Sequence, residues 1–211
     1  MIDYFLFDLD NTLYLPQKGP LTEVDRRMTH YMVECFDLTE ESAKKTRRHY
    51  CLEYGTTMAG LMKDYQIDPL HFLQYVHDIP DDTLPARDPL LREHLLAIEQ
   101  PKYILTNSYT PYAETVLQAL GVDDLFIAVF DVVTMELRNK YHEESYQKIM
   151  HLIQNSAHPH QFIMFDDLWP YLSAAKNLGL TTVLVSPDFS GEPDFHLQSI
   201  HHLSGLYAHL Y

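Results

Sequence analysis

Short apolar runs alternate with helical patterns over the second half of the chain. The runs lie at residues 102–107, 125–133, 161–167 and 181–186, and the helical patterns lie at 87–100, 111–121, 142–154 and 171–179. Continuously apolar strands separated by amphipathic helices are typical of a parallel sheet that is covered on both faces. Together with a further apolar run at residues 4–7, this alternation predicts an α/β fold with a doubly wound parallel sheet.

Residues 16–85 show an almost entirely helical pattern. We expect helices at 21–36, 38–55, 56–65 and 69–79, followed by an acidic turn at 80–85. Thr22 and Thr39 are candidate N-caps of the first two helices, because a Thr side chain can accept a hydrogen bond from a free N–H of the first turn. Since this block follows the first apolar run, we predict a small helical cap domain at 16–85, inserted into a core domain formed by 1–15 and 86–211.

The composition is that of a folded domain. The chain has 211 residues, of which 46% are hydrophobic, and this is enough for a sizeable core. No apolar run reaches the roughly 18 residues of a membrane span, and the first strand leaves no room for a signal region. We therefore expect a cytoplasmic protein that does not bind membranes. Cys35 and Cys51 lack the spacing of a zinc site or a disulfide framework, so we expect ordinary, partly buried thiols.

The formal net charge of -15 limits the possible partners. Binding to a nucleic acid polymer depends on clustered Lys and Arg, so we expect none here. A small anionic substrate remains compatible with this charge, because one pocket lysine and a divalent cation can set the local field. The 13 histidines are scattered, and we expect them to be solvated surface residues. The sequence leaves the oligomeric state open between monomer and homodimer.

Polar side chains follow the apolar runs where strands should end. They are Asp8 and Asp10, then Thr106, Asn107 and Ser108, then Asp166 and Asp167, together with Lys140 after the run at 125–133. Any one of them could be a helix cap or a turn former. Capping does not call for two pairs of acids at one edge, however, and doubly wound sheets bind ligands beyond the carboxyl ends of their strands. The set therefore predicts a functional site at that edge.

The residue types suit phosphoryl transfer. Asp8 can attack as a carboxylate nucleophile, and Asp10, two positions further on, can protonate the leaving oxygen and later deprotonate water. We expect Thr12 either to orient Asp10 or to cap the turn. The groups expected to hold the phosphate oxygens are Thr106, the backbone N–H of Asn107, and Lys140.

A metal ion would explain how several carboxylates share one crevice. Asp8, Asp166 and Asp167 would repel one another strongly without a bound cation. Oxygen ligands beside a phosphate group favour a hard ion, in particular Mg²⁺. We therefore expect Mg²⁺ as the cofactor.

Four stretches of the chain together resemble the ordered motifs of the haloacid dehalogenase-like (HAD) hydrolases. They are "FDLDNTLY", "ILTNS", the lysine of "NKYHEESY", and "FDD…AAKNLGL". The resemblance implies a Rossmann-like core, with Asp8 as the nucleophile and Asp10 as the acid/base. It also implies that Mg²⁺ is held by Asp8, the backbone carbonyl of Asp10, Asp166 and Asp167. The inserted helices resemble the family's cap, which closes over the crevice and reads the leaving group.

Within the cap, residues 53–61, "EYGTTMAGL", resemble the subgroup of pyrimidine 5′-nucleotidases. We expect Gly55 to bind substrate, and Tyr54, Arg47, Arg48 and Thr57 are further candidates because they lie near this turn. A glycine turn between two packed cap helices would explain Gly55 and Gly60 equally well, and a solvated helix face would account for the two arginines. We therefore expect a Mg-dependent phosphatase that acts through an aspartyl phosphate on a small phosphorylated metabolite. A pyrimidine nucleoside 5′-monophosphate, a sugar phosphate and phosphoglycolate all remain candidate substrates.

Four positions depart from the family pattern. Tyr141 replaces a proline after the motif lysine, Leu168 and Tyr171 replace a small polar residue and an Asn near the acid pair, and Tyr112 stands where nucleotidases often carry His. These changes leave open a non-catalytic binding protein with the same fold. A phosphomutase would share every catalytic residue, whereas a carbon–halogen dehalogenase needs no second acid, so Asp10 favours a phosphatase over a dehalogenase.

Overall fold

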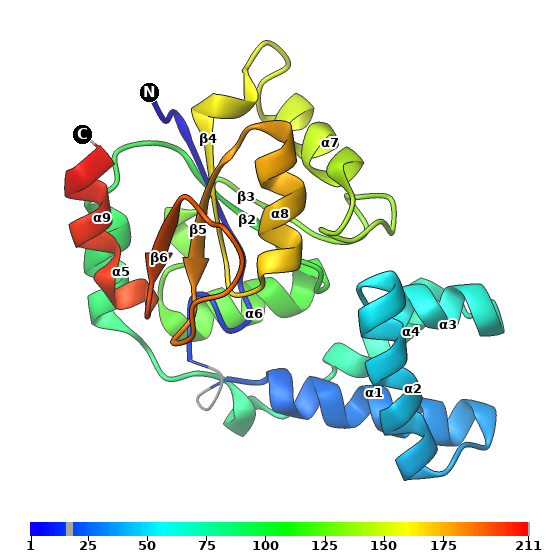
Figure 1. The fold of residues 1–211 in the computed structure, drawn as a ribbon. Coiled ribbons are helices and arrows are strands. Elements are labelled where there is room, and N and C mark those ends of the chain that lie inside the picture. Colours follow the sequence, from blue (N-terminus) through cyan, green and yellow to red (C-terminus); the bar gives the residue numbers. More distant parts are fainter. Residues whose placement is uncertain (16–18, 211) are drawn as a thin grey trace.

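A parallel sheet lies at the centre of the protein, whose computed structural model describes residues 1–15 and 19–210 (Figure 1). Within those residues the sheet has six strands in the order β3-β2-β1-β4-β5-β6, and every neighbouring pair is parallel. The strands are β1 (Tyr4–Phe7), β2 (Lys102–Leu105), β3 (Ala128–Phe130), β4 (Phe162–Asp166), β5 (Thr181–Val185) and β6 (Phe195–Leu197). The predicted α/β fold with a doubly wound parallel sheet is confirmed.

Helices connect these strands and cover both faces of the sheet. α7 and α8 pack against each other on one side, while α5 and α9 lie on the other side, each in contact with η5 (Figure 1). The helices of this part are α5 (Pro89–Leu96), α6 (Thr110–Leu120), α7 (Glu143–Ile153), α8 (Trp169–Leu178) and α9 (Leu203–Leu210). The short 3-10 turns are η2 (Asp81–Thr83), η3 (Asp123–Leu125), η4 (Pro159–Gln161) and η5 (Ile200–His202).

Three of the four residues of the central strand β1 are fully enclosed. Phe5, Leu6 and Phe7 have no exposed surface, and the ring of Phe7 stacks on that of Phe165 in β4 with ring centroids 4.5 Å apart. Burying each of these side chains stabilises the fold by about 1.5–3 kcal/mol, and a shift of one residue in register would turn every side chain of the strand to the other face of the sheet. The same packing fixes the position of Asp8, whose backbone N–H donates to the Phe165 carbonyl at 2.8 Å.

Two strands differ from the predicted runs. β3 has 3 residues, because Asp131, inside the predicted run 125–133, leaves the sheet and accepts hydrogen bonds from the backbone N–H groups of Thr110 and Thr134 at 3.0 and 2.8 Å. β6 lies in the terminal segment, where the pattern did not indicate a strand. The Asp194 carboxylate attaches this strand to β5 by accepting from the N–H and hydroxyl of Thr182 at 2.9 and 2.8 Å.

Four helices between the first two strands form a group beside the sheet, and this group is called the cap (Figure 1). They are α1 (Leu21–Phe36), α2 (Glu40–Tyr54), α3 (Thr57–Tyr65) and α4 (Pro69–His77), and each packs on at least one other member of the group. The Thr39 side chain accepts from the Ser42 N–H at 3.2 Å, as predicted for an N-cap. The prediction for Thr22 was wrong, because α1 begins at Leu21 with Pro20 at its N-cap, so Thr22 lies within the first turn. The prediction of partly buried thiols was also wrong, because Cys35 and Cys51 lie on exposed positions of α1 and α2. The predicted cap boundary at residue 16 lies outside the described residues.

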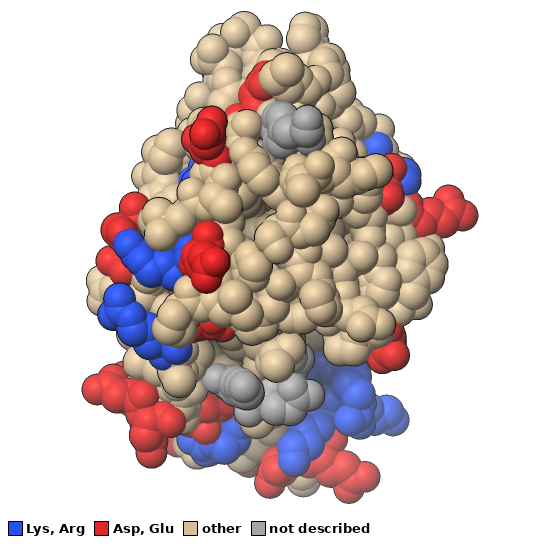
Figure 2. All heavy atoms as spheres, turned by 90° about the vertical axis from the view of Figure 1, so that its left-hand side faces the viewer, with Lys and Arg blue, Asp and Glu red and all other residues tan. Residues whose placement is uncertain are grey.

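The surface charges are mixed. Figure 2 shows one face of the molecule, on which Lys and Arg occur in small groups beside Asp and Glu. In the cap, Arg26 pairs with Glu23 at 2.7 Å, and Lys44 pairs with Glu40. Across the described residues, no helix combines the length and the apolar character that crossing a membrane requires.

Candidate active site

Three carboxylates meet at the carboxyl edge of the sheet. Asp8 follows β1, and Asp166 and Asp167 stand at the end of β4, the strand that pairs with β1. One carboxylate oxygen from each of the three lies within 4.8 Å of the others. The parallel pairing of the two strands therefore produces the acidic cluster that the sequence predicted.

Lys140 enters this cluster from the loop before α7. Its ammonium group contacts the Asp8 carboxylate and lies 2.6 Å from Asp166 Oδ2. Its backbone N–H donates to Asn107 Oδ1 at 3.0 Å, so the Asn107 side chain orients the lysine loop. Lys140 is 1% exposed, and a buried ammonium is stable only where opposite charges and hydrogen bonds compensate it. Despite Tyr141, the motif lysine therefore reaches the predicted position.

The surroundings shift the pKa values of all four groups. Burial raises the pKa of Asp166 to about 7 and that of Asp167 to about 8, and the charge of Lys140 opposes the rise in both. Burial also raises the pKa of Asp8, again against the effect of Lys140. For Lys140, burial favours the neutral form, but the charges of Asp166 and Asp8 outweigh it and hold the pKa well above its ordinary value. The cluster is short of positive charge.

The donor set fits a divalent cation. Three carboxylates against one ammonium group leave two uncompensated negative charges when all four groups are ionised. Carboxylate oxygens are the ligands that Mg²⁺ takes in proteins, and a cation among them would oppose the raised pKa values. The Asp10 side chain does not belong to this cluster, which leaves its backbone carbonyl as the group of that residue that could serve as a ligand.

Asp10 is held by hydroxyl groups. Tyr14 and Tyr112 both donate to its Oδ1, the latter at 2.7 Å, and Ser108 donates to its Oδ2 at 2.6 Å. Burial raises the pKa of both tyrosines well above the ordinary value, so both keep their donor protons at neutral pH. The expectation that Thr12 orients Asp10 was wrong. The Thr12 hydroxyl donates to Asp8 Oδ2 at 2.9 Å, one helical turn back along the chain.

A cavity of about 320 Å³ lies between this crevice and the cap. Its core side includes Asp8, Asp10, Thr106, Asn107, Lys140 and Asp167. Its cap side includes apolar residues, namely Leu21, Val24, Met28, Met58, Phe72 and Leu73, and polar ones, namely Asp25, Arg47, Thr56, Thr57 and His77. Gly55 lines the cavity, as predicted for a residue that binds substrate, whereas Tyr54 is not among the lining residues and contacts Lys63 instead. The structure therefore gives no support to a substrate contact for the Tyr54 side chain.

Residues of the third and fourth motifs attach the core to the cap. The Tyr171 hydroxyl donates to the Gly55 carbonyl at 2.9 Å, and Asn139 Nδ2 donates to the Tyr54 carbonyl at 2.7 Å. Tyr141 packs edge-on against Tyr171, with ring centroids 5.2 Å apart. Gly55 has φ +82°, and a Cβ there would lie 2.7 Å from Tyr141. A glycine is therefore required where the cap turn meets the core.

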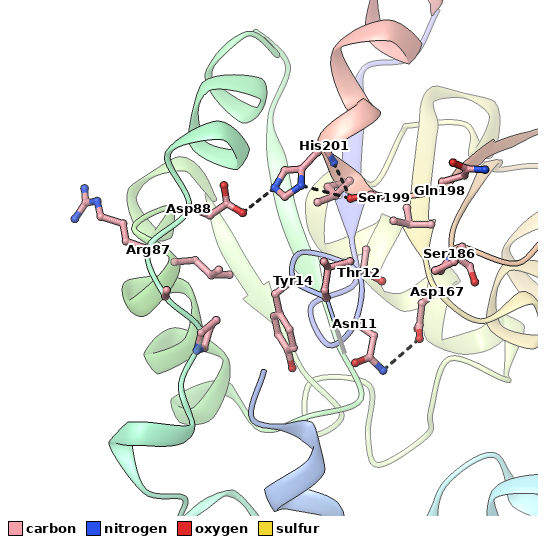
Figure 3. A pocket seen from close by; sticks show the side chains of 17 residues that line it. Asn11, Thr12, Tyr14, Arg87, Asp88, Asp167, Ser186, Gln198, Ser199 and His201 are labelled. Carbon is pink, nitrogen blue, oxygen red and sulfur yellow. Dashed lines mark hydrogen bonds and ion pairs between the residues drawn. The ribbon is translucent and has the colours of Figure 1, made fainter. Parts of the chain in front are cut away.

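A second cavity, of about 440 Å³, adjoins the crevice beside the chain segments that lead into and out of the cap (Figure 3). Asn11 and Asp167 line both cavities, and Asn11 Nδ2 donates to Asp167 Oδ2 at 3.4 Å. At the other end of the cavity, Asp88 lies 2.7 Å from His201 Nε2, while Arg87 points away (Figure 3). This cavity is distinct from the one that the cap covers, although Asn11 and Asp167 line both.

Several residues of the site had no role that could be assigned from the sequence. Asn11, Tyr14 and Asn139 were not singled out, Ser108 was noted at a strand end but assigned nothing, and Tyr112 was noted as a departure from the family. Asn11 and Tyr14 lie inside the first motif, so their position was a usable signal. The partnership of Ser108 and Tyr112 with Asp10 joins positions 98 and 102 residues apart, and no local pattern indicates it.

Comparisons with known proteins agree with this geometry. A family model for haloacid dehalogenase-like hydrolases matches residues 2–179. Phosphate metabolism protein 8 of Saccharomyces cerevisiae is 32% identical over 134 residues, which make up 58% of this chain and 41% of that protein. The match thus spans less than half the length of this curated relative.

Solved structures resemble the fold over nearly its whole length. CbbY from Rhodobacter sphaeroides, in complex with phosphate, aligns with a TM-score of 0.68, 16% identity and coverage of 96% of both chains. L-2-haloacid dehalogenase from Xanthobacter autotrophicus aligns with a TM-score of 0.63, 16% identity and coverage of 100% of both chains. At such identities the likeness concerns the fold and does not distinguish between the two chemistries.

Proposed function

The chain belongs to the haloacid dehalogenase-like hydrolase family, and we propose that it is a phosphoric monoester hydrolase that works through an aspartyl phosphate. One observation carries the proposal. Asp8 stands beside Lys140 and the acid pair, while Asp10, two residues later, is held apart from them by its own set of hydrogen bonds. A nucleophile and a separate acid/base are the two groups that this reaction needs.

The first half-reaction transfers the phosphoryl group to the protein. A carboxylate oxygen of Asp8 attacks the phosphorus atom, the bond from phosphorus to the leaving oxygen breaks, and Asp10 gives its proton to that oxygen. Lys140, which contacts Asp8, balances negative charge at the point of attack. Thr106 and the backbone N–H of Asn107 would bind phosphate oxygens, and both residues line the cavity that Asp8 also lines.

The second half-reaction releases phosphate. The Asp10 carboxylate takes a proton from water, the water oxygen attacks phosphorus, and the bond from phosphorus to Asp8 breaks. Inorganic phosphate leaves, the Asp8 carboxylate is restored, and Asp10 again carries its proton. The same two residues thus serve both halves of the cycle.

The metal would be held by Asp8, Asp166, Asp167 and the backbone carbonyl of Asp10. When bound, Mg²⁺ would neutralise part of the phosphate charge and so favour attack by an anionic carboxylate. The charge deficit of the cluster supports this assignment, because two negative charges remain after Lys140 is counted.

A nucleoside 5′-monophosphate is the substrate class that we propose. The cavity is within the size range of small-molecule sites, and its cap wall offers apolar and aromatic surface such as Met58 and Phe72 for a leaving group of some size. Phosphoglycolate would leave most of that wall unused. The resemblance of residues 53–61 to pyrimidine 5′-nucleotidases agrees with this class, and sugar phosphates are the alternative to be tested.

Dehalogenation is the second candidate, since a haloacid dehalogenase shares the fold. A halide ion leaves without a proton, so dehalogenation does not require a general acid such as Asp10. Three hydroxyl groups hold Asp10 in this protein, which favours the phosphatase reaction. The phosphate present in the structurally similar CbbY protein is consistent with the same choice.

The decisive experiment measures hydrolysis of p-nitrophenyl phosphate with Mg²⁺. Asp8→Asn should lower kcat by at least about 10⁴-fold, because no other group in the proposed cycle replaces the nucleophile. The matched control is Asp82→Asn, an exposed carboxylate in η2, which should leave the rate unchanged. A wild-type protein no faster than Asp8→Asn would refute the hydrolase assignment.

The substrate class is tested by comparing UMP and CMP with other nucleotides, sugar phosphates and phosphoglycolate. The proposal expects the highest kcat/KM with nucleoside monophosphates. If UMP and CMP were turned over no faster than the other substrates, or not at all, the pyrimidine assignment would be wrong. Measuring free phosphate separates a hydrolase from a phosphomutase, since a mutase returns the phosphoryl group to the sugar and releases none.

A further inference from the structure

We infer that Tyr14, Tyr112 and Ser108 are positioning residues for Asp10, and that their hydroxyl groups direct proton transfer to its Oδ2 atom. The inference rests on the proposed function, because it assigns how the acid/base of that reaction is held. The Asp10 carboxylate, which accepts from all three hydroxyls, lies outside the cluster of carboxylates that would hold the metal.

The three hydroxyls come from separate parts of the core. Tyr14 lies in the loop after β1, Ser108 in the loop after β2, and Tyr112 in the first turns of α6. Their exposed fractions are 6%, 8% and 3%. Because buried hydroxyl groups need a partner, and each of these three donates to Asp10, the Asp10 carboxylate is the common acceptor that satisfies all of them.

Counting acceptor positions identifies the reactive oxygen. A carboxylate has about four lone-pair positions, two on each oxygen. Tyr14 and Tyr112 take both positions on Oδ1, and Ser108 takes one on Oδ2. The hydrogen bonds of the described residues therefore leave one position, on Oδ2, for the proton that passes to the leaving oxygen or comes from water. Asp10 lines the cavity in which these partners bind.

The two tyrosine rings are themselves fixed. A Cβ at Gly19 would lie 1.8 Å from Tyr14 Cε2, so the Tyr14 ring packs directly on the backbone at Gly19. In Figure 3 the Tyr14 side chain lies beside Asn11 and points its hydroxyl away from His201. The Tyr112 ring packs on His77 at the end of α4, with ring centroids 4.6 Å apart. Tyr112 thus connects the acid to the cap as well as to the core.

The test uses two leaving groups of different basicity. An alkoxide leaves with difficulty unless it receives a proton, whereas the nitrophenolate ion leaves readily without one. The measured quantity is kcat/KM, which covers the steps up to the aspartyl phosphate and so excludes hydrolysis of that intermediate. The substrates are glycerol 2-phosphate and p-nitrophenyl phosphate, each with Mg²⁺.

Tyr112→Phe removes one hydroxyl and keeps the ring on His77. We expect kcat/KM for glycerol 2-phosphate to fall by at least about 10-fold, a part of the 10²–10⁴-fold that general acid catalysis contributes, while the value for p-nitrophenyl phosphate changes less than about 3-fold. Ser108→Ala should show the same dependence on the leaving group, which provides a second variant if Tyr112→Phe folds poorly.

Tyr50→Phe is the matched control. Tyr50 is also buried and donates to a carboxylate, that of Asp64 at 2.6 Å, but both residues lie in the cap away from the cavity lining. The Tyr50→Phe variant should keep the wild-type kcat/KM for both substrates.

Two results would overturn the positioning role while leaving the hydrolase assignment in place. They are equal losses on the two substrates, and an unchanged kcat/KM for glycerol 2-phosphate in both Tyr112→Phe and Ser108→Ala. A wild-type protein that hydrolyses neither ester would instead refute the proposed function, and the inference with it.

Discussion

The two sides of the covered cavity differ in chemistry. The core side gathers Asp8, Lys140 and Asp167 at strand ends, and the cap side combines apolar side chains such as Val24 and Phe72 with one ion pair, Arg47 and Asp25. Most of the charged groups thus lie on the core side, where strand pairing holds them within hydrogen-bond distance, while the helical insertion supplies most of the apolar surface. The difference suggests that the core decides which bond is broken and that the cap decides which molecule carries it.

The largest expected effect is on the core side. Lys140→Met should leave Asp8 and Asp166 buried without a counter-charge and should lower the free energy of unfolding by about 3–5 kcal/mol. We also expect kcat to fall by roughly 10²–10³-fold, the cost of removing one charge-stabilising group. The kcat value is measured with p-nitrophenyl phosphate, and the free energy of unfolding is measured by chemical denaturation.

The control for this variant is Lys148→Met. Lys148 pairs with Glu136 at 2.6 Å, but on the surface, with side chains 35% and 68% exposed. Its loss should cost less than about 1 kcal/mol. Similar losses of stability for the two variants would mean that the buried cluster is not held together by Lys140.

The next effect concerns pH and metal. Asp166 and Asp167 have pKa values of about 7 and about 8 in the folded protein, against an ordinary value of 3.8. The folded state therefore binds more protons than the unfolded chain between about pH 4 and pH 8. Their stabilising contribution is fully present below the unfolded pKa and is lost as the pH rises through the folded values.

Accordingly, when a chelator removes divalent cations, the free energy of unfolding should decrease as the pH rises from about 4 to about 8. Asp167→Asn should make the decrease smaller, because one of the two groups no longer titrates. Excess Mg²⁺ should stabilise the wild type, most at the upper end of the range, since the cation binds ionised carboxylates. An identical pH dependence for wild type and Asp167→Asn would contradict the prediction.

On the cap side we expect an intermediate effect, limited to substrate binding. Arg47 lines the cavity, its guanidinium group bonds to Asp25 and to Thr29, and its Nε is buried with no hydrogen-bond partner among the described residues. Arg47→Met should raise KM for a nucleoside monophosphate about 10-fold, or about 1.4 kcal/mol, and leave kcat within about twofold.

Arg48→Met supplies the comparison. Arg48 is next in the chain but exposed and absent from the cavity lining, so its KM should stay at the wild-type value. If Arg47→Met changed kcat and not KM, the division between a chemical core and a selective cap would fail at this residue.

The smallest effect is expected where the two sides touch. Tyr171→Phe removes the hydrogen bond to the Gly55 carbonyl and should cost about 1 kcal/mol of stability. Because that bond joins core to cap, KM should also rise, by about twofold to threefold, a change of under 1 kcal/mol.

Tyr146→Phe is the control for Tyr171→Phe, because it separates a loss of stability from a loss of the contact between core and cap. Tyr146 also donates to a backbone carbonyl, that of Tyr171 at 3.0 Å, but both residues lie in the core. It should cost similar stability without changing KM. Equal KM values for the two variants would show that the contact between Tyr171 and Gly55 has no part in substrate binding.

The periodic parts of the fold could be predicted from the sequence. Runs such as 102–107 and 161–167 became strands because continuous apolar character is the condition for a strand buried on both faces. β6 was missed because its attachment depends on Asp194 bonding to Thr182, 12 positions away. Thr22 was misplaced as a cap because α1 begins at Leu21 without a side-chain cap, and a local pattern defines a helix end only to within one or two residues.

The candidate site shows the same division. The sequence alone placed Asp8 with Asp166 and Asp167, because the carboxyl ends of parallel strands share one edge whatever the details of packing. The tertiary structure decided that Tyr112 and Ser108 hold Asp10, and that Tyr171 docks the cap. Strand ends are specified by a repeating local pattern of burial, whereas these hydrogen bonds join groups about a hundred positions apart, which meet only when the whole core has packed.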